Sequence, residues 1–175
     1  MVNIRRAAPD DAASLACLAE RTFRDTYTAN NDPSDMDFHC QNNFNVEIQH
    51  HEILEPNYVT ILAEMGTELV AFAQVKLHSP KQCIQAEHPS ELYRLYVSNE
   101  WHGRGVAHEV MTEVLAVAAG GEADHLWLSV WEQNPKAIAF YRKYGFKVVG
   151  NNIFQVGADP QQDLIMAVEL AGQLA

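Results

Sequence analysis

Small residues recur at close spacing after residues 91–97, an alternating apolar run that predicts a β-strand. Gly103, Gly105 and Ala107 leave the main chain of the following turn unshielded, and a helical pattern begins at Val106. The first N–H groups of a helix have no partner within the helix, so such a turn can bind an anion such as pyrophosphate. The segment indicates a phosphate-bearing cofactor, although a strand-to-helix turn without a ligand explains it equally well when it is taken alone.

The spacing of this turn excludes two common phosphate-binding loops. A dinucleotide-binding loop needs a small residue where this chain has His108, and a P-loop needs a Lys-Ser or Lys-Thr pair that does not follow the glycines. Residues 102–107, HGRGVA, instead resemble the Gln/Arg-x-x-Gly-x-Gly/Ala motif of the GCN5-related N-acetyltransferase (GNAT) family, with a histidine at the first position. The resemblance implies that coenzyme A is bound by His102, Gly103, Arg104, Gly105, Val106 and Ala107.

Residues 134–146, NPKAIAFYRKYGF, match a second motif of the same family, N-x-x-A-x-x-F-Y-x-x-x-G-F, at every defined position. The segment also predicts a helix by itself, because Pro135 suits a first helical turn and Gly145 a left-handed end. By resemblance, the cofactor is also contacted by Asn134, Phe140 and Lys143, and by the backbone of Leu95, Tyr96 and Val97, which would pair with the pantetheine arm as an added strand. Lys143 fits a solvated helix surface equally well, and residues 95–97 fit an ordinary core strand.

Transfer of an acetyl group from a thioester to an amine requires a proton for the departing thiolate. Tyr141 is the candidate general acid, because a phenol with a pKa of about 10 keeps its proton at neutral pH, and the family resemblance implies the same role. A core aromatic residue is the alternative. The amine must lose a proton before it attacks, and Glu91 is the first candidate for the base. Asp25 and Glu132 are weaker candidates, and all three also fit ordinary surface carboxylates.

Further segments resemble the bacterial spermidine/spermine N-acetyltransferase (PaiA-type) subgroup, namely residues 22–27, 127–132 and 162–167. This resemblance implies that the acceptor is a small-molecule amine, preferably a polyamine. Phe23, Tyr27 and Tyr93 would line its methylene chain, and a loop with Asp25, Asp32, Asp35 and Asp37 would attract its charges. Two alternatives stay open: a protein or peptide N-acetyltransferase, and a coenzyme A-binding sensor without turnover, which would not need Tyr141.

Length and composition predict a single domain over residues 1–175, and the resemblance implies that it is an N-acetyltransferase domain. Acidic residues outnumber basic ones by 23 to 12, which disfavours nucleic acid as a partner. The sequence shows neither a signal peptide nor the roughly 20 apolar residues of a membrane span, so we expect a cytoplasmic protein without a membrane partner. The three cysteines lack a CxxC pair and the histidines lack ligand spacing, which predicts reduced thiols and no metal. Relatives in the family are often dimers, which makes a homodimer one expectation.

Hydrophobic periodicity predicts an α/β fold, with a mixed, mostly antiparallel sheet of six to seven strands flanked by helices. The resemblance identifies this as the GNAT acyl-CoA N-acyltransferase fold. We expect a loop that covers the substrate in residues 24–45 and a connection in residues 152–162. Strands are expected at residues 2–6, 58–64, 69–77, 91–97, 126–132, 146–151 and 163–169, and helices after Pro9 and at residues 46–54, 106–119 and 135–144.

Overall fold

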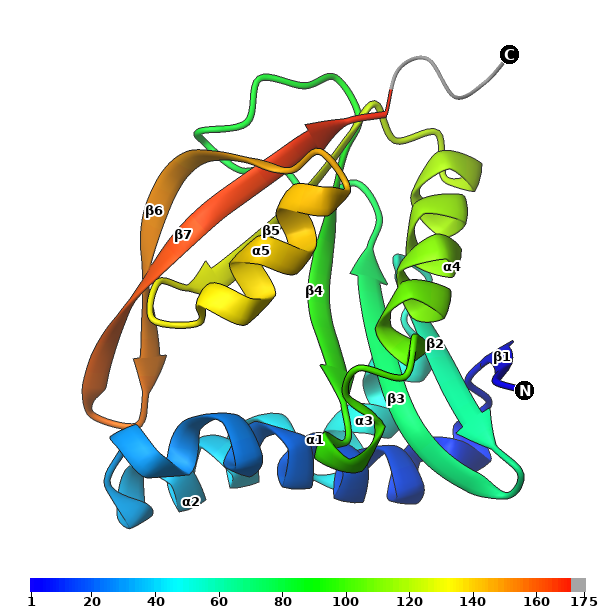
Figure 1. The fold of residues 1–175 in the computed structure, drawn as a ribbon, viewed down its shortest axis with the longest axis vertical. Helices are drawn as coiled ribbons and strands as arrows, with labels where there is room; N and C mark the ends of the chain where they lie inside the picture. The colour runs from blue at the N-terminus through cyan, green and yellow to red at the C-terminus, as the bar shows by residue number, and fades with distance from the viewer. Residues whose placement is uncertain (171–175) are drawn as a thin grey trace.

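The computed structural model describes residues 1–170, which form a seven-stranded mixed sheet in the order β1-β2-β3-β4-β5-β7-β6 (Figure 1). Neighbouring strands are antiparallel except β4 and β5, which are parallel. The expected fold class is therefore confirmed. The strands are β1 (Asn3–Arg6), β2 (Tyr58–Met65), β3 (Glu68–Lys76), β4 (Pro89–Val97), β5 (His125–Trp131), β6 (Lys147–Val156) and β7 (Asp159–Glu169). The α-helices of the described residues are α1 (Ala12–Tyr27), α2 (Pro33–Asn43), α3 (Val46–Leu54), α4 (Val106–Gly120) and α5 (Pro135–Lys143).

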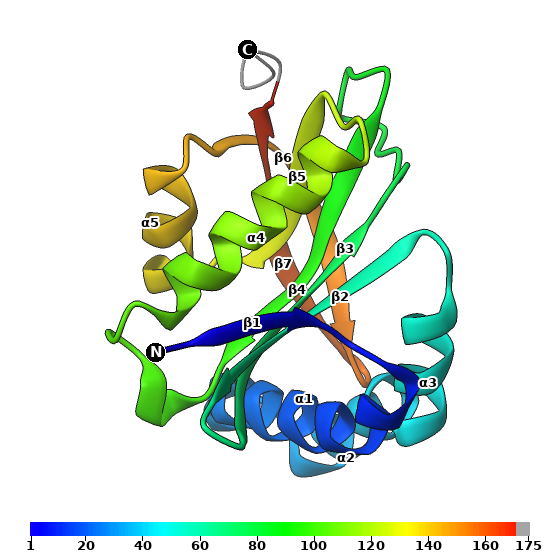
Figure 2. The same cartoon turned by 90° about the vertical axis from the view of Figure 1, so that its right-hand side faces the viewer.

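Helices cover both faces of the sheet, with α4 and α5 on one face and α1 to α3 on the other (Figure 2). The alternation of side chains along each strand supplies one apolar core to each face. Ile61 and Ala73 face each other in the β2–β3 pairing and join the core under α4, whereas the next pair, Leu62 and Phe72, joins the core under α1. The apolar runs of the central strands are thus explained by burial on both faces.

Strands β4 and β5 pair only over their first halves. Their parallel register runs from Pro89 opposite His125 to Leu92 opposite Leu128, and then the strands diverge (Figure 1). Beyond that point, among the described residues, β4 pairs with β3 alone. The divergence opens the middle of the sheet at the level of residues 93–97 and leaves one backbone edge of β4 facing a wedge-shaped gap.

Residues 24–45 are largely helical, so the expected covering loop is wrong. Helix α1 continues to Tyr27, and α2 begins after Asp32, whose side chain accepts a hydrogen bond from the Ser34 N–H at 2.8 Å. Pro33 occupies the first turn, where its missing N–H costs nothing. Met36, His39 and Cys40 form the buried stripe of α2. The polar residues that suggest a loop are the cap and the solvent face of this helix.

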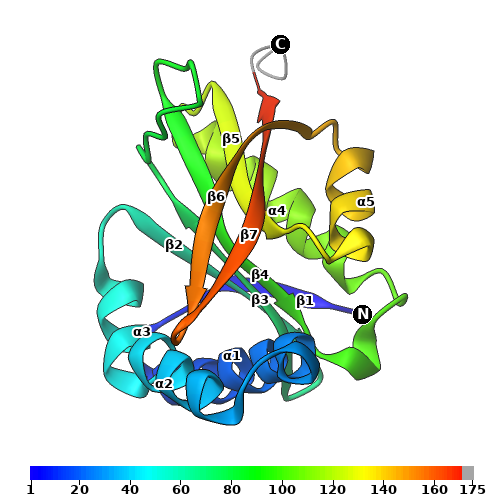
Figure 3. The same cartoon turned by 90° about the vertical axis from the view of Figure 1, so that its left-hand side faces the viewer.

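Residues 152–162 belong to strands β6 and β7 and the turn between them, so the irregular connection expected there is wrong. Strands β6 and β7 form one long hairpin that extends from the α5 side of the sheet to α2 (Figure 3). The turn lies between Val156 and Asp159, with Gly157 at φ +59°, a left-handed conformation that suits glycine. The N–H of Ala158 donates to Asp35 Oδ1 at 2.8 Å and ties the tip of the hairpin to α2.

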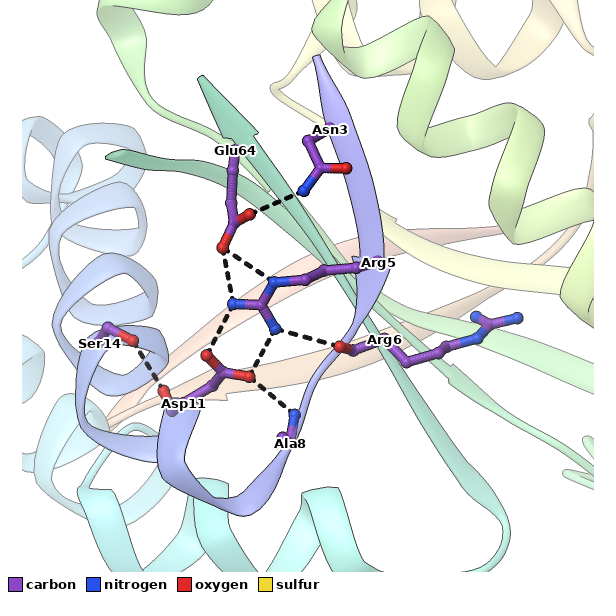
Figure 4. Close-up of polar contacts among 7 residues, drawn as sticks. All are labelled: Asn3, Arg5, Arg6, Ala8, Asp11, Ser14 and Glu64. Carbon is purple, nitrogen blue, oxygen red and sulfur yellow. Dashed lines mark hydrogen bonds and ion pairs between the residues drawn. The ribbon is translucent and has the colours of Figure 1, made fainter. Parts of the chain in front are cut away.

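The connection from β1 to α1 is held by a cluster around Arg5 (Figure 4). Its guanidinium pairs with the Asp11 carboxylate at 2.7 Å and with the Glu64 carboxylate at 2.6 Å, and Glu64 also accepts from Asn3. Hydrogen bonds from Arg5 are the largest cause of the lowered pKa of both carboxyl groups. The cluster fixes the start of α1, the helix that reaches the gap between β4 and β5 through its last turn.

Candidate active site

The gap between β4 and β5 is a cleft with a volume of about 540 Å³. Its walls come from the last turn of α1, the diverging halves of β4 and β5, the turn before α4, and α5. The sequence-predicted residues that line it are Tyr27, Tyr93, Leu95, Tyr96, Val97, His102, Gly103, Gly105, Ala107, Asn134, Phe140, Tyr141 and Lys143. Two motifs far apart in the sequence are thus brought to one cavity.

The glycine-rich turn has the backbone conformation that an anion site needs. Gly103 and Gly105 have φ values of +74° and +85°, and a Cβ at either position would meet no atom within 4 Å. Gly105 is the N-cap of α4, so the first N–H groups of that helix lie beside an open surface. The side chains of Arg104 and Val106 do not line the cleft, because Arg104 stacks over Trp101 at 5.1 Å and Val106 is 1% exposed.

His102, which replaces the usual Gln or Arg of the motif, links the turn to the end of β4. Its Nε2 lies 2.8 Å from the Val97 carbonyl oxygen, and its Nδ1 lies 3.2 Å from Lys136 Nζ. The carbonyl can only accept and the ammonium can only donate, so the ring carries its proton on Nε2. Val97 therefore has its carbonyl engaged by His102 inside the cleft.

Tyr141 enters the cleft from α5, which begins with Asn134 as the N-cap. The Asn134 side chain accepts from the Ala137 N–H at 3.1 Å, so it both lines the cleft and fixes the helix. Tyr141 is 9% exposed, and burial, followed by the nearby Tyr96, raises the pKa of its phenol. The hydroxyl is consequently protonated at neutral pH, as a proton donor must be.

Aromatic residues form the end of the cleft near α1. Tyr27 lies against Trp131, with ring centroids 5.4 Å apart, and Tyr93 and Tyr96 line the opposite strand. Phe23 is not part of the wall, because it is 1% exposed and packs behind Tyr27 at 4.4 Å. These rings give the cleft an apolar surface with phenol hydroxyls at its edge.

The acidic residues predicted for substrate binding do not gather at the cleft. Asp25 is exposed on α1 and does not line it, and Asp35 is bound by the hairpin tip. Asp37 pairs with Arg24 at 2.8 Å, and Asp32 caps α2. The cation-attracting loop is therefore wrong in its geometry, since three of these carboxylates are engaged in the structure of the helices and hairpin.

Glu91, the predicted base, lies at the closed end of the β4–β5 pairing, opposite Trp127, and does not line the cleft. Its carboxylate accepts from Ser79 Oγ at 3.0 Å. Burial raises the pKa of this carboxyl group, whereas the charge of Lys76 lowers it. Its role as a base stays a prediction.

Arg94, which no sequence pattern singles out, is one of the residues that line the cleft, and its guanidinium belongs to a buried polar network. Its Nη1 donates to Glu52 Oε2 at 2.6 Å and to Gln74 Oε1 at 2.7 Å, and its guanidinium stacks on Tyr93 at 4.4 Å. The three polar residues come from α3, β3 and β4, so no local sequence pattern predicts that they meet. The network fixes the part of β4 that carries Tyr93. Wall residues that were not among the predicted site residues include Trp101, His108, Ser129, Trp131 and Lys136.

Residues 1–170 show neither a metal site nor a helix that could span a membrane. Within this range, no group of three or more histidine, cysteine or acidic side chains is arranged to hold a metal ion. None of the helices in the same range has the length and apolar character that a membrane span requires.

Known proteins resemble this chain over nearly its whole length. The model of the acetyltransferase (GNAT) family matches residues 19–146. An uncharacterized N-acetyltransferase of Mycobacterium tuberculosis is 30% identical over 91% of this chain and 98% of its own. Among solved structures, the PaiA N-acetyltransferase of Thermoplasma acidophilum in complex with coenzyme A has a TM-score of 0.78 and 21% identity, covering 97% of this chain and 99% of that one. The ribosomal-protein-alanine N-acetyltransferase of Brucella melitensis has a TM-score of 0.68 and 21% identity, with coverage of 95% and 99%. The chain belongs to the GNAT family and is an acetyl-CoA-dependent N-acetyltransferase.

Proposed function

We propose that the cleft holds acetyl-CoA against β4 and transfers its acetyl group directly to a primary amine. The observation that carries this proposal is the meeting in one cavity of a β4 backbone edge that β5 leaves unpaired, a bare helix N-terminus and a buried tyrosine. The pyrophosphate would lie on the turn of Gly103 and Gly105, and the pantetheine would pair with the backbone of residues 95–97. This places the thioester between the diverging strands, near Tyr141.

The role of Tyr141 in this arrangement is to protonate the coenzyme A thiolate. The neutral amine nitrogen attacks the thioester carbonyl and loses one N–H proton to water as the amide forms. The C–S bond breaks when the tetrahedral intermediate collapses, and the phenol proton passes to the leaving sulfur. Burial keeps the phenol neutral until this negative charge develops beside it. Tyr141 thus donates one proton in each turnover, and its phenolate then takes up a proton from solvent.

The acceptor that we propose is a polyamine such as spermidine or spermine. Tyr27, Tyr93 and Trp131 offer aromatic surface for a methylene chain, and the PaiA N-acetyltransferase is among the similar structures. The aspartates of α2 do not support this choice, because they point to other partners. A peptide amine is the second candidate, favoured by the similarity to a ribosomal-protein-alanine N-acetyltransferase. The position of Tyr141 in the cleft speaks against a sensor without turnover.

The experiment is a measurement of thiol release from acetyl-CoA with spermidine, spermine, putrescine and peptides that begin with alanine. We expect saturable release with a polyamine. Tyr141→Phe should lower kcat by about 10²- to 10⁴-fold without changing the affinity for coenzyme A. Tyr58→Phe, which removes a hydroxyl outside the cleft, is the matched control. Thiol release with peptides alone would make a peptide amine the acceptor in place of a polyamine. Binding of coenzyme A without thiol release for any amine would support the sensor without turnover.

A further inference from the structure

Ser129 is exposed although it lies on β5, a central strand of the sheet. The residues before and after it, Leu128 and Val130, are buried at 1% and 6% exposure. The reason is the divergence of β4, because the last β4–β5 pair, Leu92 with Leu128, comes one residue before Ser129. The Ser129 side chain therefore opens into the cleft and forms part of its wall.

Asp163 supports Ser129 from the neighbouring strand β7. Ser129 is opposite Ile165 and Trp131 is opposite Asp163, so Ser129 and Asp163 are diagonal neighbours on the same face of the sheet. Ser129 Oγ donates its proton to Asp163 Oδ2 at 2.8 Å. Because that proton is engaged, Ser129 Oγ has only acceptor lone pairs to offer to the cleft. A group that donates N–H is what such an oxygen can bind.

Asp163 is buried, with 5% of the residue exposed. Among residues 1–170, its carboxylate forms no ion pair, and its Oδ1 has no hydrogen-bond partner. Burial raises the pKa of this carboxyl group; the Ser129 hydrogen bond opposes the rise, and the charge of Glu132 adds to it. An unpaired buried carboxylate is costly, and groups of this kind concentrate at functional sites.

Asp163 acts electrostatically on the phenol groups that line the cleft. Burial is the main cause of the raised pKa of Tyr27, and Tyr96, Asp163 and Tyr141 raise it further, so Tyr27 is near all three groups. Asp163 also contributes, after burial, to the pKa of Tyr96, which reaches about 12. The Asp163 carboxylate therefore acts on the part of the cleft that Tyr27 and Tyr96 line, where we expect the amine to bind.

We propose that Ser129 binds the amino group of the acceptor and that Asp163 positions Ser129 and supplies the charge that selects a cationic amine. This inference rests on the proposed acetyl transfer to an amine. The amine donates an N–H to Ser129 Oγ, Ser129 donates to Asp163, and the buried carboxylate gains the positive partner that the described residues do not give it. Ser129 touches the substrate, whereas Asp163 acts through Ser129. A neutral alcohol would gain little from this pair, which therefore favours amines over hydroxyl acceptors.

The first test is a kinetic comparison with the amine acceptor that the wild-type enzyme uses, spermidine or an alanine-ended peptide. Asp163→Asn keeps the size of the side chain and an oxygen for Ser129 but removes the charge. We expect its KM for the amine to rise by about 10- to 100-fold, the range for one hydrogen bond to a charged group, with the KM for acetyl-CoA unchanged. Ser129→Ala should change the amine KM in the same direction. Glu169→Gln, which removes an exposed carboxylate from the same strand, should change neither constant.

The second test measures binding without turnover, by calorimetric titration of spermidine into the complex with coenzyme A. Wild type should bind it, and Asp163→Asn should bind it about 10- to 100-fold more weakly. Turnover of an amine with the same amine KM in wild type and Asp163→Asn would overturn this inference and leave the proposed function intact. Parallel changes in both KM values, with a lowered melting temperature, would indicate a structural role and also overturn it. Wild type that neither binds nor acetylates any amine would overturn both proposals.

Discussion

Gly105→Ala separates two costs that usually occur together, strain in the fold and loss of a ligand contact. Gly105 has a φ of +85°, and an added Cβ would meet no atom within 4 Å. The cost to the fold is therefore conformational alone, about 1–2 kcal/mol for placing a non-glycine residue in the left-handed region. For a domain of this size, that corresponds to a fall in Tm of about 2–8 °C.

The effect on the cofactor adds to this cost, because Gly105 lines the cleft and precedes the first N–H groups of α4. A methyl group there keeps the pyrophosphate from one backbone donor. Loss of one hydrogen bond to a charged group costs about 1.5–3 kcal/mol, so the Kd for coenzyme A should rise by about 10- to 150-fold. Calorimetric titration with coenzyme A measures this change directly.

Gly66→Ala is the matched control, because Gly66 has a φ of +65° and equally open surroundings but lies in the β2–β3 turn. It should lower Tm by a similar amount and leave the Kd for coenzyme A unchanged. Gly103→Ala, at φ +74° in the cleft, should behave like Gly105→Ala. Equal Kd values for the Gly66 and Gly105 variants would refute the assignment of the turn to the pyrophosphate.

Three further predictions concern stability and are measured by urea unfolding. Glu52→Gln leaves the Arg94 guanidinium, which is 7% exposed, without its carboxylate, and should lower the free energy of unfolding by about 3 kcal/mol; a loss below about 1 kcal/mol would contradict a buried pair. Asp11→Asn should destabilise the fold at neutral pH but not in acid, because the lowered pKa of Asp11 beside Arg5 gives stability that disappears as the pH falls through the folded-state pKa. Asp163→Asn should have the opposite sign and stabilise the fold at neutral pH. Because the pKa of Asp163 is raised in the folded state, its ionised carboxylate destabilises the wild-type fold at neutral pH, and this destabilisation disappears below the unfolded-state pKa of about 3.9. A lower free energy of unfolding for Asp163→Asn than for wild type at neutral pH would contradict the unpaired state of this carboxylate.

The parts of the fold that follow from local pattern are predictable from the sequence. The hairpin around Gly66, the turn before Val106 and the helix between Asn134 and Gly145 each carry their own start, stop and apolar period, and each lies within a few residues of its expected place. Strands β6 and β7 are predicted in part, at residues 146–151 and 163–169, whereas helix α2 and the extension of both strands through residues 152–162 are not. The cap of α2 and the turn of the hairpin resemble loop sequence, and α2 is stabilised by packing against α1. Tertiary burial decides such segments where composition does not.

The candidate site also has one part that local sequence predicts and another part that it does not. The glycine turn and Tyr141 belong to contiguous motifs, so their approximate positions follow from spacing. Ser129 and Asp163 come together only through the register of β5 and β7, and Ser129 is reached only because β4 diverges from β5. Neither the register nor the divergence is encoded in a local run of residues. The expected acidic loop failed for the converse reason, since side chains that are close in sequence point to different partners on a helix.

The divergence of β4 from β5 also bears on how long the folded protein lasts in a cell. A sheet that opens at its centre has two additional strand edges. The Val97 and Trp131 carbonyls on these edges have partners in His102 and Asn134, and the groups without a protein partner depend on water or on a ligand. A donor molecule that fills the seam closes the sheet and so contributes to the free energy of folding. At a concentration one hundred times its Kd, such a ligand adds about 2.7 kcal/mol, a large part of the stability of an ordinary domain. We therefore expect the fraction of folded chain to rise with the concentration of acetyl-CoA, because the open seam that binds the donor is also the least paired part of the sheet.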